Sequence, residues 1–210
     1  KCILIGGSPL SPHLYKEGLK HNLNLYLTYG MTEMSSQICM QKSGMHHFFS
    51  QGHLLPYRQL KLAPDGEVLV KGKTLFKGFL GEAKQIKNIS SLKGSWYRTK
   101  DIATFSEKTG LTIIGRKDRL FISGGENIYP EEIEQALLHF PEVLEARVEA
   151  HPDKTFGFRP HAFIRGKETF KQEEVREFLT SLLPKYKIPI QFHLMKESKA
   201  KNFKTAFNDL

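Results

Sequence analysis

The feature that most constrains the fold is the charged segment Gly115-Arg116-Lys117-Asp118, which separates two stretches of different patterning. Before it, short strand-like runs dominate, and after it strands alternate with amphipathic helices. A joint that is charged and not apolar suits a hinge whose backbone changes conformation in water. We therefore predict a first domain over residues 1–115, a hinge at 116–118 and a second domain over 119–210.

The first domain divides into an α/β unit over residues 1–44 and a β subdomain over 45–115. In the α/β unit we expect strands at Cys2–Ile5 and Leu23–Tyr29, ended by Gly30, and helices at Leu10–Leu19 and Thr32–Met40. Ser11 followed by Pro12 is typical of a helix start. The β subdomain is predicted to form a small barrel-like sheet from the runs Tyr57–Leu62, Glu67–Lys71, Ile102–Phe105 and Leu111–Ile114.

The second domain is predicted to be compact α+β. Apolar residues at helical spacing indicate helices at Pro130–His139 and Gln172–Leu183. Strand-like runs stand at Leu120–Ser123, Val143–Ala150, His161–Ile164 and Ile190–Leu194. The lysine-rich end, Lys196–Lys204, is polar and is expected to be mobile.

Charge and composition exclude several classes of function. Lys and Arg number 31 against 22 Asp and Glu, a formal net charge of +9, but no run holds five like charges. This pattern argues against a nucleic-acid-binding arm and fits a surface that attracts anionic small molecules. No apolar run approaches the roughly 20 residues of a membrane span. Cys2 and Cys39 are the only cysteines, so we expect no disulfide framework, no cysteine-based zinc site and a cytoplasmic location.

The run Tyr29-Gly30-Met31-Thr32-Glu33 stands at a predicted strand-to-helix turn. A hydroxyl next to a carboxylate suits a phosphate group and its Mg²⁺, because the hydroxyl donates to phosphate and the carboxylate binds the metal. The same pair also suits an ordinary helix start, with Thr32 as N-cap and Glu33 in the first turn. Taken alone, the run favours the helix start.

Asp101 precedes a predicted strand, and an acidic residue at a strand can accept both hydroxyls of a ribose. Taken alone, Asp101 is more simply interpreted as a solvated residue in a turn. Gly124-Gly125 would let a ligand lie against bare backbone, or would form a hairpin turn. A flexible lysine from the group Lys199, Lys201 and Lys204 could close over a site and stabilise negative charge, or simply be solvated. Gly6-Gly7-Ser8 lacks the continuation of a P-loop.

Together and in this order, these segments resemble the C-terminal half of the adenylate-forming superfamily, which includes acyl-CoA synthetases, peptide-synthetase adenylation domains and luciferases. The runs YGMTEMSSQ, FISGGENIYPEEIE and FGFRPHAFI are most similar to the family of CoA ligases that act on 2-succinylbenzoate in menaquinone biosynthesis. The resemblance extends from Ile3 to Lys204. It implies part of a large adenylation domain followed by a mobile C-terminal lid domain.

The resemblance also implies roles for individual positions. Nucleotide contacts would come from Gly6, Gly7, Ser8, Tyr29, Gly30, Thr32, Asp101 and Arg116. Tyr29 would pack on adenine, Asp101 and Arg116 would hold the ribose, Thr32 the α-phosphate and Glu33 the Mg²⁺. Ser35 and Ser36 would lie near the acyl pocket, Asp118 would be the hinge residue, and Gly124 and Gly125 would border the pantetheine channel of CoA. Lys204 would be the catalytic lysine, although Phe203 and Phe207 replace the family's Gly and Arg around it and Lys199 or Lys201 could serve instead.

The substrates implied are ATP with Mg²⁺, CoA and a small carboxylic acid, and a homo-oligomer could form through the missing part or through the large domain. The family's glycine- and hydroxyl-rich phosphate loop and its N-terminal subdomain are not in this sequence, so we expect roughly the second half of an enzyme, inactive alone. Two alternatives stay open: a synthetase or adenylation domain for another acid, and a non-catalytic nucleotide- or partner-binding remnant. The reading frame upstream of Lys1 distinguishes the remnant from the enzyme.

Overall fold

The computed structural model describes residues 2–8, 10–42, 50–80, 86–88, 96–166 and 171–195. The chain forms two compact units, Lys1–Leu120 and Phe121–Leu210. The division falls just beyond the segment 116–118 that the sequence marks as a hinge. No helix in the described ranges is long and apolar enough to cross a membrane.

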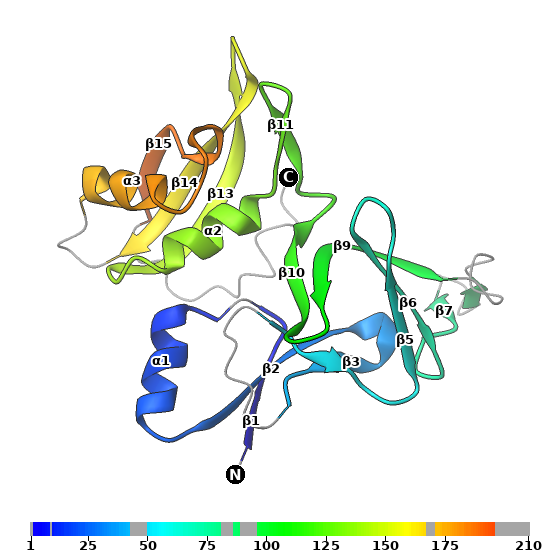
Figure 1. Cartoon of the computed structure of the whole chain (residues 1–210). Helices are drawn as coiled ribbons and strands as arrows, with labels where there is room; N and C mark the ends of the chain where they lie inside the picture. The colour runs from blue at the N-terminus through cyan, green and yellow to red at the C-terminus, as the bar shows by residue number, and fades with distance from the viewer. Residues whose placement is uncertain are drawn as a thin grey trace. The chain divides into compact units, whose positions relative to one another are not determined.

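The first unit begins with a four-stranded sheet and one helix. Strand β1 (Cys2–Ile5) runs parallel to β2 (Asn24–Met31), and β3 (Ser36–Met40) and β4 (His53–Leu54) follow in antiparallel pairs, in the order β1-β2-β3-β4. Helix α1 (Pro12–Lys20) lies beside β2 (Figure 1) and buries Tyr15 against Leu25 and Leu27. As predicted, Ser11 caps this helix, because its Oγ accepts a 3.2 Å hydrogen bond from the Leu14 N–H.

Two local predictions in this region are wrong. Gly30 does not end the strand but lies within β2, at a register shift against β3. A Cβ on Gly30 would stand 2.3 Å from the Ser36 carbonyl oxygen, so only glycine lets β3 pair this closely. The predicted helix Thr32–Met40 is a single 3₁₀ turn, η1 (Thr32–Met34), followed by β3, because Ser35 takes a left-handed conformation (φ 60°) that ends the turn.

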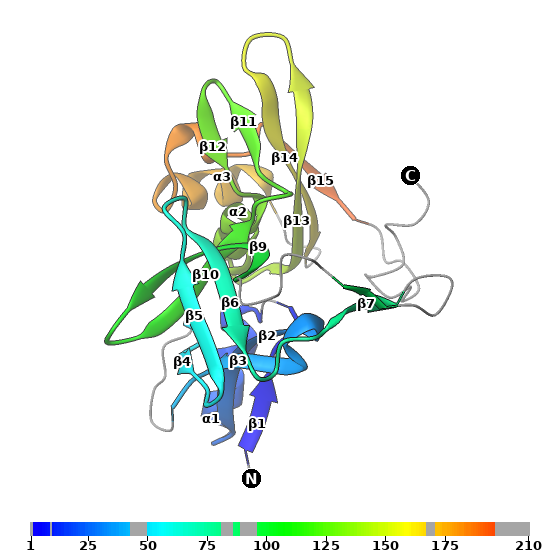
Figure 2. The same cartoon turned by 90° about the vertical axis from the view of Figure 1, so that its right-hand side faces the viewer.

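The second sheet of this unit is antiparallel and confirms the predicted β region. It consists of β5 (Arg58–Leu62), β6 (Glu67–Gly72), β9 (Tyr97–Ser106) and β10 (Gly110–Arg116), with β5 and β6 in front in Figure 2. The order is β10-β9-β6-β5 (Figure 1). A short hairpin is formed by β7 (Gly78–Leu80) and β8 (Ile86–Asn88). The two sheets share one apolar core, whose buried members are Tyr29, Met34, Ile38, Cys39, Val68, Val70, Ala103 and Leu111.

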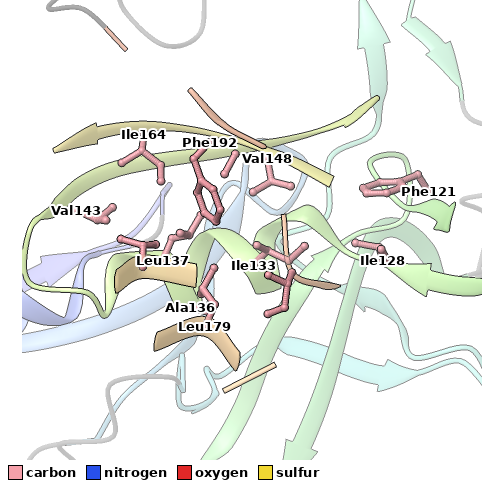
Figure 3. Close-up of a cluster of buried hydrophobic side chains, with 13 residues drawn as sticks. Phe121, Ile128, Ile133, Ala136, Leu137, Val143, Val148, Ile164, Leu179 and Phe192 are labelled. Atoms are coloured by element: carbon pink, nitrogen blue, oxygen red, sulfur yellow. The ribbon is translucent and has the colours of Figure 1, made fainter. Parts of the chain in front are cut away.

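The second unit confirms the predicted α+β arrangement. Its strands are β11 (Phe121–Ser123), β12 (Glu126–Ile128), β13 (Val143–Asp153), β14 (Gly157–Gly166) and β15 (Gln191–Leu194). The sheet order is β12-β11-β14-β13, and β15 pairs with β14 in parallel. Helices α2 (Pro130–Leu138) and α3 (Gln172–Thr180) and the 3₁₀ turn η3 (Lys185–Lys187) complete the unit. Figure 3 shows the core in which Ile133 and Leu137 of α2 and Leu179 of α3 lie with Val148, Ile164 and Phe192 of the sheet.

Candidate functional site

The centre of the candidate site in the first unit is a contact between β2 and β9. The Tyr29 hydroxyl donates a 2.5 Å hydrogen bond to Asp101 Oδ2, and both residues are 9% exposed. Burial raises the pKa of Tyr29, and the Asp101 charge raises it further, so the hydroxyl stays protonated and can only donate to this carboxylate. Because the Tyr29 ring lies in the apolar core, little of it is open to an adenine.

Asp101 has one partner at each carboxylate oxygen. Arg116 Nη1 donates to Oδ1 at 3.2 Å, while Tyr29 holds Oδ2. Burial raises the pKa of Asp101, the Tyr29 hydroxyl and the Arg116 guanidinium oppose this, and the charges of Asp118 and Glu33 add to the rise. Each carboxylate oxygen can accept more than one hydrogen bond. The arrangement can therefore still accept a pair of vicinal hydroxyls.

Arg116 links Asp101 to Asp118. Its Nε donates to Asp118 Oδ1 at 2.9 Å and its Nη2 to Oδ2 at 2.8 Å, a bidentate pair that fixes the guanidinium plane. The Arg116 contact lowers the pKa of Asp118, so that carboxylate is held in its charged form. The Arg116 side chain thus joins Asp101, the expected ribose residue, to Asp118, the expected hinge residue. The side chains of Arg116 and Asp118 are 44% and 41% exposed.

Thr32 and Glu33 follow β2 directly, on the turn η1. Thr32 is exposed and Glu33 half-buried, and the Glu33 carbonyl accepts a 2.8 Å hydrogen bond from the Phe76 N–H. The charge of Glu33 contributes to the raised pKa of both Asp101 and Tyr97. This places its carboxylate within electrostatic reach of the Asp101 group.

A single carboxylate next to a hydroxyl fits Mg²⁺, which proteins usually hold through one or two carboxylates together with substrate phosphates. In the part of the chain that the structure describes, no group of three or more His, Cys, Asp or Glu side chains could hold a metal ion by itself. Glu33 therefore fits a metal whose remaining ligands come from a nucleotide.

Gly6, Gly7 and Ser8 are exposed at the carboxyl end of β1, where the last pair of the parallel β1–β2 ladder is Ile5 with Leu27. A Cβ on Gly6 would stand 2.4 Å from Thr28 Oγ1, directly before Tyr29, and Gly7 has a left-handed φ of +86°. In open α/β sheets ligands bind outside the carboxyl ends of the strands. The glycine segment and Tyr29 are thus brought to the same sheet edge.

Of the other expected residues, two follow the turn η1 and two belong to the second unit. Ser35 Oγ donates to the Thr74 carbonyl at 2.9 Å, and Ser36 begins β3. Gly124 and Gly125, with φ of +59° and +89°, form the two-residue turn of the β11–β12 hairpin in the second unit. Lys199, Lys201 and Lys204 lie outside the described residues.

Four residues around the site had no individual role predicted from the sequence: Glu67, Tyr97, Lys100 and Lys117, the last of which lies in the predicted hinge 116–118. Burial and then the Glu33 charge raise the pKa of Tyr97, whose neighbourhood also includes Arg116 and Asp101. Glu67 is only 1% exposed, although it begins a strand after the turn Pro64-Asp65-Gly66. The alternation of apolar and polar residues along a strand cannot distinguish a buried Glu from an exposed one at the end of that strand. Lys100 has a positive φ of 65°, which the sequence could not predict because the residue is not a glycine.

Comparison with known families gives one domain match. Residues 132–204 match the family described as the AMP-binding enzyme C-terminal domain. Curated relatives similar to the chain include the 2-succinylbenzoate–CoA ligases of Bacillus licheniformis, 36% identical over 206 residues, and of Listeria monocytogenes, 35% identical over 199 residues. The matches cover 93% and 94% of this chain but only 43% and 42% of those relatives. The chain thus spans less than half of their length.

Solved structures give the same result. The o-succinylbenzoate CoA synthetase of Bacillus subtilis in complex with its acyl-adenylate intermediate superposes with a TM-score of 0.79 at 34% identity, covering 93% of this chain and 42% of that one. The same synthetase in complex with ATP and magnesium ion gives a TM-score of 0.78 at 33% identity, with the same coverage.

Proposed function

We propose that this chain, whose residues 132–204 match the AMP-binding enzyme C-terminal domain and whose relatives include 2-succinylbenzoate–CoA ligases, supplies the C-terminal part of an ATP-dependent 2-succinylbenzoate–CoA ligase of menaquinone biosynthesis. The reaction would run in two steps, formation of an acyl-adenylate and then of a thioester with CoA. The observation that carries the proposal is the group Tyr29, Asp101, Arg116 and Asp118, a set of buried and half-exposed partners suited to a nucleoside.

In the first step, Asp101 would accept the two ribose hydroxyls of ATP while Tyr29 and Arg116 hold its carboxylate in place. The glycines at 6 and 7 let the nucleotide lie close to the backbone at the end of β1. Thr32 would donate to the α-phosphate, and Glu33 would hold a Mg²⁺ that offsets phosphate charge. The substrate carboxylate attacks the α-phosphorus, the bond to the β-phosphate oxygen breaks, and pyrophosphate leaves. Lys204 is our candidate for the lysine that stabilises charge at the α-phosphorus.

In the second step, we propose that the unit Phe121–Leu210 turns about Asp118. This rotation withdraws Lys204 and brings the Gly124–Gly125 turn to the site, where the CoA thiolate attacks the acyl carbonyl and AMP leaves. One cleft then serves two reactions with different leaving groups. The exposed, glycine-only turn between β11 and β12 supports this assignment, because both positions have left-handed backbone and no side chain to obstruct a pantetheine arm.

We further propose that CoA and the acid are the remaining partners, that the large domain mediates homo-oligomerisation, and that the enzyme acts in the cytoplasm. Cys2 and Cys39 are both free thiols, which fits a reducing compartment.

The test uses the complete reading frame that contains this chain. With ATP, Mg²⁺ and 2-succinylbenzoate we expect pyrophosphate release, and with CoA added we expect the thioester. Asp101→Ala should reduce pyrophosphate release by at least about a hundredfold, in line with the loss of buried charge-assisted contacts to substrate, while Glu17→Gln on the exposed face of α1 should leave it unchanged. Asp118→Pro should impair one half-reaction more than the other, since it restricts the hinge.

Three results would count against the proposal. Turnover of other acids but not 2-succinylbenzoate assigns the chain to another synthetase. Nucleotide binding without pyrophosphate release for any acid indicates a non-catalytic remnant. Full ligase activity from the 210-residue chain alone would contradict the expected need for a separate phosphate loop.

A further inference from the structure

Glu67 is a buried carboxylate that the proposed reaction does not use. Its side chain is 2% exposed, at the start of β6. Its oxygens contact the Arg98 guanidinium, the Lys100 backbone N–H at 3.2 Å and Lys117 Nζ at 3.3 Å. Burial would raise the pKa of Glu67, but these donors outweigh it and lower the pKa. A carboxylate held charged in the interior depends on its partners and in turn fixes their positions.

One side of this cluster fixes the backbone next to Asp101. Glu67 accepts a hydrogen bond from the N–H of Lys100, whose φ is 65°. Residues other than glycine rarely adopt this conformation. Lys100 directly precedes Asp101, and its carbonyl accepts a 2.7 Å hydrogen bond from the Lys117 N–H. The left-handed turn therefore sets the direction in which the Asp101 carboxylate leaves β9.

The other side fixes the segment 116–118. Lys117 Nζ lies 3.3 Å from Glu67 Oε2 and 2.6 Å from Asp65 Oδ2. Lys117 stands between Arg116 and Asp118, the two residues of the bidentate pair beside Asp101. Because Lys117 is bound through both its backbone N–H and its ammonium group, the positions of its two neighbours are set from β6 and β9.

We propose that Glu67 is a positioning residue that anchors the segment 116–118 to β9 and so places Arg116 and Asp118 beside Asp101. Only the consequence of this anchor for catalysis rests on the function proposed above. In that reaction Glu67 would fix one wall of the nucleotide site and the base of the hinge. The physical anchor itself is a property of the chain's first unit. It predicts that removing the charge of Glu67 releases the hinge segment and leaves the core of the unit intact.

The experiment compares Glu67→Gln with Glu107→Gln in the 210-residue chain by hydrogen–deuterium exchange. Gln keeps the volume of Glu67 but loses the charge, and Glu107, exposed on the turn after β9, is the matched loss of one negative charge. We expect exchange over residues 100 and 116–119 to rise at least about tenfold in Glu67→Gln only, the loss expected for a hydrogen bond to a charged group. Exchange in α2 of the other unit should not change.

Lys117→Met is the second variant, since its side chain is 46% exposed and its loss leaves Glu67 paired with Arg98 and the Lys100 N–H. It should raise exchange over residues 116–119, and adding Glu67→Gln to it should have little further effect on those residues, because Glu67 reaches them through Lys117. Residue 100 should still respond to Glu67→Gln, because its N–H has its own contact with Glu67. Unchanged exchange over 116–119 in both variants overturns the proposal. An equal rise throughout the first unit also overturns it, since Glu67 would then be a general stability residue.

In the complete reading frame, Glu67→Gln should raise the KM for ATP about tenfold or more, as expected when a positioned charge contact is lost, and Glu67→Asp, which restores the charge, should recover part of it. An absent activity in the wild-type protein would refute the ligase assignment and leave the exchange result valid. An unchanged KM with raised exchange would overturn the positioning role.

Discussion

The Tyr29 hydroxyl and the Asp101 carboxylate, 72 residues apart in sequence, are joined by a hydrogen bond of 2.5 Å in the core of the first unit. One residue comes from the α/β sheet and the other from the antiparallel sheet, so this contact ties the two sheets together next to the candidate ribose site. The Asp101 carboxylate is therefore oriented on both sides, by Tyr29 and by Arg116.

Tyr29→Phe tests this contact. It removes the donor and leaves a buried carboxylate oxygen without that hydrogen bond, so we expect the free energy of unfolding to fall by about 1–3 kcal/mol. The measurement is urea unfolding at neutral pH. Tyr26→Phe, on the same strand β2, is the matched loss of one hydroxyl and should change stability by less. Equal effects of the two substitutions would contradict the special role of the Tyr29 hydroxyl.

Three imidazoles on the second unit predict a pH dependence of stability. His161 stacks on His151 with ring centroids 3.9 Å apart, and its Nδ1 lies 3.2 Å from His193 Nε2. Burial lowers the pKa of His161, and the neighbouring histidines lower it further. Two charged residues flank these rings: Glu149 pairs with His161 in register and lies 3.9 Å from His151 Nε2, and Arg159 pairs with His151 in register.

The direction of the pH dependence of stability follows from the number of protons that the folded and unfolded states bind. An unfolded histidine titrates near about 6.5, above the folded value, so the unfolded state binds more protons as pH falls through that window. Stability should be full above about pH 6.5 and fall below it. Urea unfolding at about pH 7.5 and 5.5 should show a smaller difference in His161→Gln than in the wild type or in His13→Gln, an exposed histidine of α1. An identical difference in all three proteins would exclude the cluster as its source.

The sequence predicted most of the elements but not the contacts that make the site. Periodicity found α1, α2 and α3 and the longer strands of both units, because apolar spacing directly reports which face is buried, but it did not find the short strands β4, β7, β8 and β12. It failed at Thr32–Met40, where Ile38, Cys39 and Met40 fit either a helix or a strand, and the left-handed Ser35 decides for a strand.

The site was predicted through resemblance, position by position, and the structure brings Tyr29, Asp101, Arg116 and Asp118 together. Glu67 and Lys117 could not be found this way. Their role depends on a buried ion cluster between β6, β9 and the segment after β10, and pairing between residues 50 apart leaves no local pattern in the sequence.

The two cysteines should differ in reactivity towards a thiol reagent. Cys39 is 1% exposed and burial raises its pKa to about 12, whereas Cys2 is exposed on β1. The thiolate is the reactive form, so Cys39 is protected both by its protonation and by its burial. With Ellman's reagent we expect one fast thiol in the folded protein and two in urea. The Cys2→Ser protein should show no fast thiol until it unfolds, and a fast thiol in that folded variant would contradict the burial of Cys39.

The glycine turn between β11 and β12 offers a matched pair of substitutions. Gly124 and Gly125 both have positive φ, so alanine at either position carries a strain of about 1–2 kcal/mol. A Cβ at Gly124 would also stand 2.8 Å from Phe156 Cδ1, whereas a Cβ at Gly125 would meet nothing within 4 Å. Gly124→Ala should therefore destabilise the second unit more than Gly125→Ala, as measured by thermal unfolding. Gly125→Asn should be milder than Gly125→Ala, since Asn tolerates the left-handed region. If the two alanine variants unfold at the same temperature, Phe156 moves aside freely and only backbone strain limits this turn.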